Sequence, residues 1–133
     1  MIKVAVYGTL RFGFVNYDRF LRGAPYLGRG LTGFDAELYG RGIIPFLKKA
    51  PESGRRVVVE VYEVCERRLA RLDVLEGHPD IYRRERLPVL LSHNGEKVSA
   101  WVYVFQGGVE GGFFLDYEER LKGVKGVDDY VCV

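Results

Sequence analysis

Residues 57–64 read VVVEVYEV, and residues 66–76, which follow after a single Cys65, read ERRLARLDVLE. Valine and tyrosine are enriched in strands, so the first segment predicts the strongest β-strand of the chain. Apolar residues recur at helical spacing in the second segment, which predicts a helix that ends before Gly77 and Pro79. A strand that leads directly into a helix is therefore expected at the centre of the fold.

The N-terminal half predicts further short strands and a short helix. Residues 2–7 are rich in β-branched side chains and are followed by Gly8, so we expect a strand and then a glycine-containing turn. Residues 16–21 predict one or two helical turns with Asn16 as the N-cap. Glycines recur among apolar residues between positions 24 and 47, which suits bends and bulges in curved strands: Gly28, Gly30, Gly33, Gly40 and Gly42.

The C-terminal half predicts a hairpin and a short helix. Residues 82–91 and 97–105 read as two strands joined by a turn that contains His93, Asn94 and Gly95. A short helix is expected over residues 115–121 and a terminal strand over residues 130–133. No internal repeat or linker is present, so we predict a single domain over residues 1–133. Its class is α+β, a curved and mainly β structure with two or three short helices.

The bulk composition is that of a globular protein. The chain has 133 residues, of which 47% are hydrophobic and 29% charged, and this composition excludes an intrinsically disordered chain. The formal net charge of +2 is too small to indicate a nucleic-acid partner by itself.

Cysteines, histidines and apolar segments exclude several kinds of site. Cys65 and Cys132 are far apart, which predicts two reduced, buried thiols in a cytoplasmic protein. His78 and His93 stand at no ligand spacing from a cysteine or from each other, so no metal and no cofactor are expected. The chain begins directly with a strand pattern rather than a signal peptide, and no window is apolar enough to span a membrane.

Glu76 is a carboxylate in an unusual position. At about 100° per residue it lies about 20° from Cys65 around the helix, within the apolar stripe that Leu69 and Leu72 define. The side chain is therefore expected to point toward the core, at a helix C-terminus, where the helix dipole disfavours negative charge. Both effects raise the pKa of a carboxyl group, as acid/base chemistry near neutral pH requires. The alternative is a frayed helix end, with Glu76 in solvent or paired with Arg83.

The turn after the first strand is a second candidate site. It can aim consecutive backbone N–H groups into one concavity, and such concavities bind anions. Gly8 would allow a ligand to approach closely, Thr9 adds a hydroxyl, and Arg11 has the geometry to bind a carboxylate through two hydrogen bonds. The alternative is an ordinary turn in which the glycine supplies a positive φ.

The two motifs together resemble the γ-glutamylcyclotransferase-like family, in its γ-glutamylamine cyclotransferase and AIG2-like branch. The residues that carry the resemblance are YGTLR at 7–11, LDVLEGHP at 72–79 and the Tyr82-Arg83 pair. The segments VEVYEV at 59–64 and WVYV at 101–104 look like further strands of the family. The resemblance thus extends from the first strand to about Phe105.

The resemblance implies a small mixed β-barrel with flanking short helices and a cavity for a small γ-glutamyl substrate. The implied reaction is intramolecular: the α-amino group attacks the γ-carbonyl, 5-oxoproline forms and an amine leaves, with no metal or cofactor. The implied roles are general acid/base catalysis for Glu76, γ-glutamyl binding by the loop and cavity lining by one tyrosine. The substrate-binding residues would be Tyr7, Gly8, Thr9, Leu10 and Tyr82.

Two departures from the family pattern bear on the substrate. Val59 stands where the family usually has a glycine, and the bulky Phe12 follows the YGTLR motif. A non-catalytic small-molecule-binding protein on the same scaffold is an alternative function.

A role in RNA binding is a second alternative, because the chain has arginine pairs at 55–56, 67–68 and 83–84. Acidic residues nearly balance the basic ones, and no stacking platform is evident. We therefore expect solvated surface arginines and no nucleic-acid partner.

Overall fold

Strand β5 (Val58–Val64) is buried on both of its faces in the computed structural model, which describes residues 1–122. Val59 and Val61 belong to the core cluster inside the barrel described below. Tyr62 and Val64 belong to a second cluster, which contains Leu69 and Leu72 of the following helix. Alternate residues of a strand face opposite sides, so burial of both sides explains the nearly continuous apolar run.

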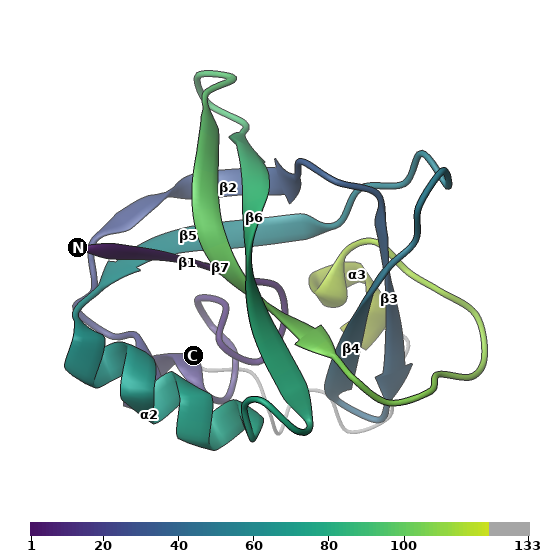
Figure 1. The fold of residues 1–133 in the computed structure, drawn as a ribbon, viewed down its shortest axis with the longest axis horizontal. Helices are drawn as coiled ribbons and strands as arrows, with labels where there is room; N and C mark the ends of the chain where they lie inside the picture. Colours follow the sequence, from purple (N-terminus) through teal and green to yellow (C-terminus); the bar gives the residue numbers. More distant parts are fainter. Residues whose placement is uncertain (123–133) are drawn as a thin grey trace.

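Five strands close into a barrel in the order β1-β5-β2-β6-β7 (Figure 1). Pairing within the barrel is antiparallel except between β1 and β7, where Val4 pairs with Trp101 in parallel, so the barrel is mixed. This confirms the expected small mixed barrel and the α+β class. Besides β5, the strands are β1 (Ile2–Val6), β2 (Tyr26–Thr32), β6 (Tyr82–Leu91) and β7 (Lys97–Phe105).

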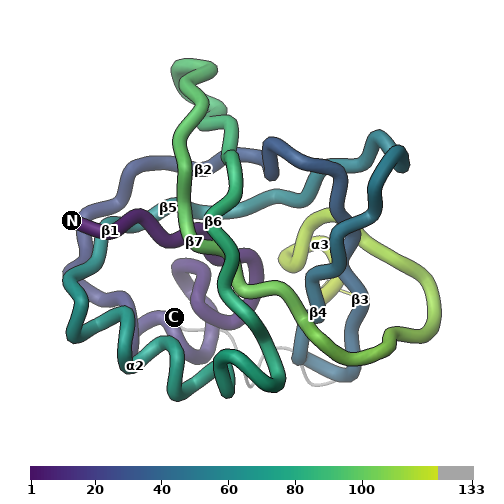
Figure 2. Tube along the Cα trace, viewed as in Figure 1, coloured from purple at the N-terminus to yellow at the C-terminus, as the bar shows by residue number. Residues whose placement is uncertain are grey.

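A separate hairpin of β3 (Ala36–Arg41) and β4 (Ile44–Lys49) packs beside the barrel. Within residues 1–122, β3 and β4 pair with each other and with no other strand. A single isolated bridge also joins Leu38 of β3 to Phe114. The trace shows α2 and this hairpin on opposite sides of the view, with the β6–β7 hairpin between them (Figure 2). Ala36, Leu38 and Leu47 of the hairpin extend the core of the barrel.

Within residues 1–122, three short helices flank the sheets: α1 (Tyr17–Phe20), α2 (Glu66–Glu76) and α3 (Tyr117–Leu121). The predicted bounds of α2 are confirmed, and Gly77 ends the helix in the left-handed conformation with φ 63°. α3 starts two residues later than predicted, because Asp116 acts as its N-cap and accepts a hydrogen bond from the backbone amide of Glu118.

One expectation about local structure was wrong. Cys65 is exposed rather than buried, because as N-cap of α2 it has an extended backbone and leaves the helical stripe. Asn16 is the N-cap of α1, as predicted, but its side chain makes no capping hydrogen bond, because its amide donates to the hydroxyl of Thr9. The predicted strand at 130–133 and Cys132 lie outside the described residues.

Candidate active site

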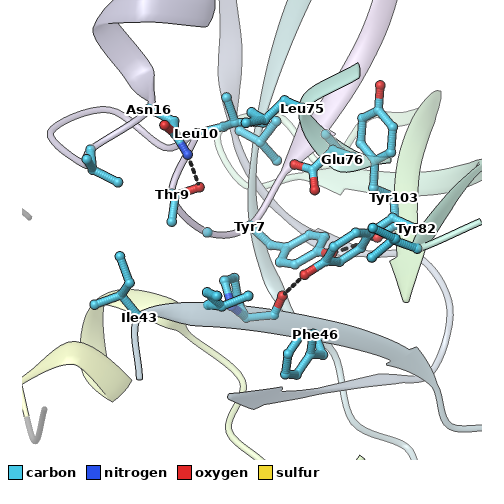
Figure 3. A pocket seen from close by; sticks show the side chains of 17 residues that line it. Tyr7, Thr9, Leu10, Asn16, Ile43, Phe46, Leu75, Glu76, Tyr82 and Tyr103 are labelled. Carbon is cyan, nitrogen blue, oxygen red and sulfur yellow. Dashed lines mark hydrogen bonds between the residues drawn. The ribbon is translucent and has the colours of Figure 1, made fainter. Parts of the chain in front are cut away.

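A pocket of about 400 Å³ lies between the turn that follows β1, the end of α2, the hairpin strand β4 and the strands β6 and β7. Glu76 and the five expected substrate-binding residues all line it, whereas Arg11 does not, and Figure 3 shows Tyr7, Glu76 and Tyr82 close together. The structure therefore brings together two motifs that are more than sixty positions apart in the chain. The pocket is lined by Ala5, Val6, Tyr7, Gly8, Thr9, Leu10, Val15, Asn16, Ile43, Ile44, Pro45, Phe46, Leu75, Glu76, Ile81, Tyr82 and Tyr103.

Glu76 is the last residue of α2 and is half-buried in this pocket. Within residues 1–122 its carboxyl group has no hydrogen-bond or ion-pair partner, so the expected alternative of a pair with Arg83 is not seen. Burial raises the pKa of Glu76 from 4.5 to about 7. The group can therefore exchange a proton near neutral pH.

The hydroxyl groups of two pocket tyrosines each donate a hydrogen bond to a backbone carbonyl oxygen. Tyr7 donates to the carbonyl oxygen of Tyr103 at 2.7 Å, and Tyr82 donates to the carbonyl oxygen of Pro45 at 2.8 Å. Burial and the nearby Glu76 raise the pKa of Tyr82, and burial is also the main cause of the raised pKa of Tyr7. Both hydroxyls therefore stay neutral and can only accept a further hydrogen bond, which suits a cationic donor such as an ammonium group.

The turn after β1 contributes Gly8, Thr9 and Leu10 to the lining of the pocket. Among the described residues, none accepts a hydrogen bond from the amides of Gly8, Thr9 or Leu10. The turn itself is held by Arg11 N to Gly8 O and Asn16 N to Thr9 O, both 2.9 Å. The Thr9 hydroxyl accepts from the Asn16 side chain at 2.9 Å and keeps its own proton for donation. This wall of the pocket is suited to negatively charged oxygens.

Gly8 is required here by close packing rather than by its φ angle. A Cβ at this position would lie 2.3 Å from Cγ of Pro45. The backbone of the turn therefore approaches β4 more closely than any other residue would permit. The positive φ that the sequence alternative invoked is not found at Gly8.

Arg11 binds carboxylates, but they are those of the protein. Its Nε donates to Glu60 and its Nη1 to Asp116, both at 2.9 Å, and only 2% of the side chain is exposed. The expected carboxylate binding by Arg11 is found, but the partners belong to β5 and to the N-cap of α3 rather than to a ligand, and Glu118 lies 3.9 Å from Nη2. Arg11 instead anchors the loop that follows the YGTL turn.

Asp73 fixes the C-terminal turn of α2 to the barrel. Its carboxylate accepts from the Tyr103 hydroxyl at 2.7 Å and from Nε of Arg84 at 2.9 Å. The Arg84 guanidinium also lies over the ring of Trp101, 4.3 Å from its centroid. Since Asp73 is one helical turn before Glu76, these contacts determine where the catalytic candidate sits relative to β6 and β7.

A family profile described as gamma-glutamyl cyclotransferase, AIG2-like matches residues 4–121. The chain belongs to this family. A gamma-glutamylaminecyclotransferase of Rattus norvegicus is 34% identical over 132 residues, which is 90% of this chain and 89% of that protein. A Methanocaldococcus jannaschii relative, provisionally named a gamma-glutamylcyclotransferase, is 40% identical over 121 residues, 88% of this chain and 98% of its own.

Solved structures of other proteins share the fold. A crystal structure of an AIG2-like protein from Mus musculus superposes with a TM-score of 0.79 at 32% identity and covers 88% of each chain. An uncharacterised protein from Pyrococcus horikoshii gives a TM-score of 0.70 at 27% identity over 92% of this chain and 95% of that chain.

The two departures from the family pattern lie outside the pocket. Val59 is fully buried in the barrel core, and Phe12 is 70% exposed on the loop beyond the turn. Neither is among the lining residues, so the expectation that the two departures bear on the substrate finds no support in this pocket.

Sequence reasoning missed the pocket residues of other segments, above all Asn16, Pro45 and Tyr103. Tyr103 lies in β7, as the sequence predicts. Its side chain can be assigned to the pocket from strand alternation only when the strand pairing is known. Pro45 gave no signal at all, because its place depends on how the β3–β4 hairpin folds back over the barrel.

Within residues 1–122, no group of three or more histidine, cysteine, aspartate or glutamate side chains is placed to hold a metal ion. In the same part of the chain, no helix has the length and apolar character needed to cross a membrane.

Proposed function

We propose that the protein is a γ-glutamylcyclotransferase that cyclises a γ-glutamyl amine or peptide to 5-oxoproline, with Glu76 as the general acid/base. One observation carries the proposal. Among residues 1–122, a carboxyl group without a hydrogen-bond or ion-pair partner, whose pKa burial raises to about 7, shares one pocket with three backbone amides that have no acceptor. Family membership and the names of the relatives support the same reaction.

The substrate would bind through both of its charged groups. The α-ammonium fits the Glu76 carboxylate and the acceptor oxygens of Tyr7 and Tyr82, whose protons are held by backbone carbonyls. The α-carboxylate fits the amides of Gly8, Thr9 and Leu10 together with the Thr9 hydroxyl. Binding both groups folds the substrate so that its own amino nitrogen approaches the γ-carbonyl carbon.

The reaction then needs only proton transfers. Glu76 removes a proton from the α-ammonium, and the amino nitrogen forms a bond to the γ-carbonyl carbon. Glu76 returns this first proton to the leaving nitrogen as the amide C–N bond breaks, and its carboxylate then accepts the second proton from the ring nitrogen. The products are 5-oxoproline, whose ring nitrogen keeps one hydrogen, and the amine, which takes up the second proton from Glu76 and leaves as an ammonium ion. A carboxyl group with a pKa near 7 serves in both directions.

The test is release of 5-oxoproline and free amine from a panel of γ-glutamyl amides and dipeptides. Glu76→Gln keeps the shape of the side chain but cannot carry the proton, so we expect kcat to fall roughly 10²- to 10⁴-fold while the protein remains folded. Glu110→Gln, at an exposed position outside the pocket, is the matched control and should retain wild-type activity. Binding of γ-glutamyl compounds without release of 5-oxoproline would instead favour the non-catalytic binding protein.

A further inference from the structure

A second cavity, of about 570 Å³, lies on the outer face of the barrel. Its floor is part of β5, where Glu60 and Tyr62 alternate with residues of the barrel core and therefore face outward. On the neighbouring strand β2, Arg29 pairs with Glu60 and Tyr26 pairs with Tyr62. The remaining walls come from the loop between β1 and α1, from α1 and from α3. In the described part of the chain, no residue lines both this cavity and the candidate active site.

Four aromatic rings line the second cavity as one continuous cluster. The ring of Tyr62 lies 5.2 Å from that of Tyr26 and 6.0 Å from that of Tyr17. Phe12 meets Tyr17 edge to face at 5.1 Å, with 79° between the ring planes. Phe12 is 70% exposed and Tyr26 is 55% exposed, so two of the four rings are largely open to a ligand. The faces of such rings attract cations, because the aromatic quadrupole is negative there.

Carboxylates outnumber guanidinium groups around this cavity. Arg11 and Arg29 both bind Asp116, at 2.9 and 3.1 Å, and Arg11 also binds Glu60 at 2.9 Å. Glu118 lies 3.9 Å from Nη2 of Arg11, and 54% of its side chain is exposed. These five groups carry two positive and three negative charges, which leaves one negative charge. The exposed Glu118 carboxylate is the most weakly paired of the three, so the local charge favours a cation over an anion.

The acceptor oxygens at the floor of the cavity are already in use. Oε1 of Glu60 accepts from the backbone amide of Phe12 at 2.8 Å and from the hydroxyl of Tyr62 at 2.9 Å. Oε2 of Glu60 accepts from Nε of Arg11. A primary ammonium group needs several acceptors when it leaves water, and Glu60 has little capacity left for them. A methylated ammonium group keeps the charge, needs fewer acceptors and interacts favourably with aromatic faces.

We propose that this second cavity binds an organic cation with a methylated nitrogen, typically a quaternary ammonium group. The cation contacts the open rings of Phe12 and Tyr26, and the Glu118 carboxylate supplies the opposite charge. The proposal does not depend on the cyclotransferase reaction, because it uses no residue of the active-site pocket. It assigns a ligand to a part of the chain that the proposed reaction leaves unused.

Three small probes test the chemistry of this site. Choline carries a quaternary ammonium group, 3,3-dimethylbutan-1-ol has the same shape without the charge, and ethanolamine has the charge without the methyl groups. Calorimetric titration of the full chain gives a Kd for each. We expect choline to bind at least about tenfold more tightly than either of the other two. Equal Kd values for choline and the alcohol would overturn cation binding, and equal values for choline and ethanolamine would overturn the preference for a methylated nitrogen. Absence of choline binding would overturn the proposal as a whole.

Variants locate the bound choline. Tyr26→Leu removes an exposed ring and should raise the Kd roughly three- to tenfold, and Glu118→Gln removes the exposed charge and should raise it roughly two- to fivefold. Tyr39→Leu and Glu76→Gln make matched changes outside this cavity and should leave the Kd unchanged. Thermal unfolding shows which variants are folded, and Glu118→Gln alone suffices if Tyr26→Leu is not. Loss of choline binding in Glu76→Gln would assign the ligand to the active-site pocket and overturn the proposal. Wild-type binding in the folded variants of Tyr26 and Glu118 would overturn it as well.

Discussion

The hydroxyl of Tyr82 donates a 2.8 Å hydrogen bond to the carbonyl oxygen of Pro45, and this bond joins barrel strand β6 to the β3–β4 hairpin across the pocket. The same hydroxyl has acceptor capacity left for a ligand. The Tyr82 side chain therefore combines a structural contact with a proposed role in ammonium binding. Stability measurements test the contact, and kinetic measurements test the binding role.

Tyr82→Phe is expected to lower kcat/KM roughly tenfold and to reduce the free energy of unfolding by about 1–3 kcal/mol, because the Pro45 carbonyl loses its buried partner. Tyr39→Phe is the control, since it removes a hydroxyl that bonds to Glu37 on the hairpin and lies outside the pocket. Loss of stability with unchanged kcat/KM would show that the Tyr82 hydroxyl serves the fold alone.

A substrate without its α-carboxylate tests the amide-lined turn. The 4-aminobutyryl amides keep the amino group and the γ-carbonyl but lack the carboxylate that we assign to Gly8, Thr9 and Leu10. We expect kcat/KM to fall roughly 10- to 100-fold, mainly through KM, since hydrogen bonds to a charged group are lost. A fall in kcat with KM unchanged would instead assign these amides to the oxyanion of the transition state.

The pH dependence of kcat/KM should show an acid limb with a pKa of about 7, because Glu76 must be ionised to accept the first proton. The measurement is a pH series with one γ-glutamyl amide at substrate concentrations far below KM. An acid limb near pH 4.5 would mean that the active carboxylate is not the buried one. Persistence of the same limb in Glu76→Gln would assign it to another group.

Stability should also depend on the protonation of Glu76. Its folded-state pKa of about 7 is above the ordinary 4.5, so the folded state holds the proton more tightly than the unfolded state does. Its contribution is therefore most favourable below pH 4.5 and is lost as the pH rises to 7, by roughly 1.4 kcal/mol per pH unit. We expect Glu76→Gln to unfold like the wild type at pH 4.5 and to be more stable by up to about 3 kcal/mol at pH 8. Urea unfolding at both pH values measures this, and a difference that does not change with pH would contradict the shifted pKa.

Gly8→Ala should disturb the pocket through packing. Its Cβ would meet Pro45 Cγ at 2.3 Å, so the hairpin or the turn must move, at a cost of about 1–3 kcal/mol in unfolding free energy. Gly108→Ala is the matched control, because no atom lies within 4 Å of its added Cβ. Wild-type stability and activity of Gly8→Ala would show that the contact between the turn and β4 is not needed.

The local elements were predictable where the signal lies within a few residues. The strand over 57–64, the helix over 66–76 and the hairpin of 82–91 with 97–105 follow from periodicity, β-branched content and glycine stops, and the structure has them at nearly these bounds. Burial of Cys65 was expected from the usual behaviour of free cysteines, but Cys65 is the N-cap of α2 and is exposed.

The candidate site was predictable only in part, for a physical reason. Glu76 and the turn at 7–11 carry motifs, and the convergence of both on one pocket was inferred from the family resemblance. The role of Arg11 was not predictable, because its carboxylate partners Glu60 and Asp116 come from segments 49 and 105 positions away. The place of Pro45 in the pocket likewise depends on long-range packing.

The β3–β4 hairpin contributes one wall of the pocket, yet its strands take no part in the closed barrel. Changes at its tip, residues 42–44, therefore leave every strand pair of the barrel in place. Relatives that share this scaffold could diversify the amine they release by exchanging that tip alone, while the proton-transfer machinery on the other wall stays as it is. The same separation makes the tip a natural position at which to graft a new selectivity onto the enzyme.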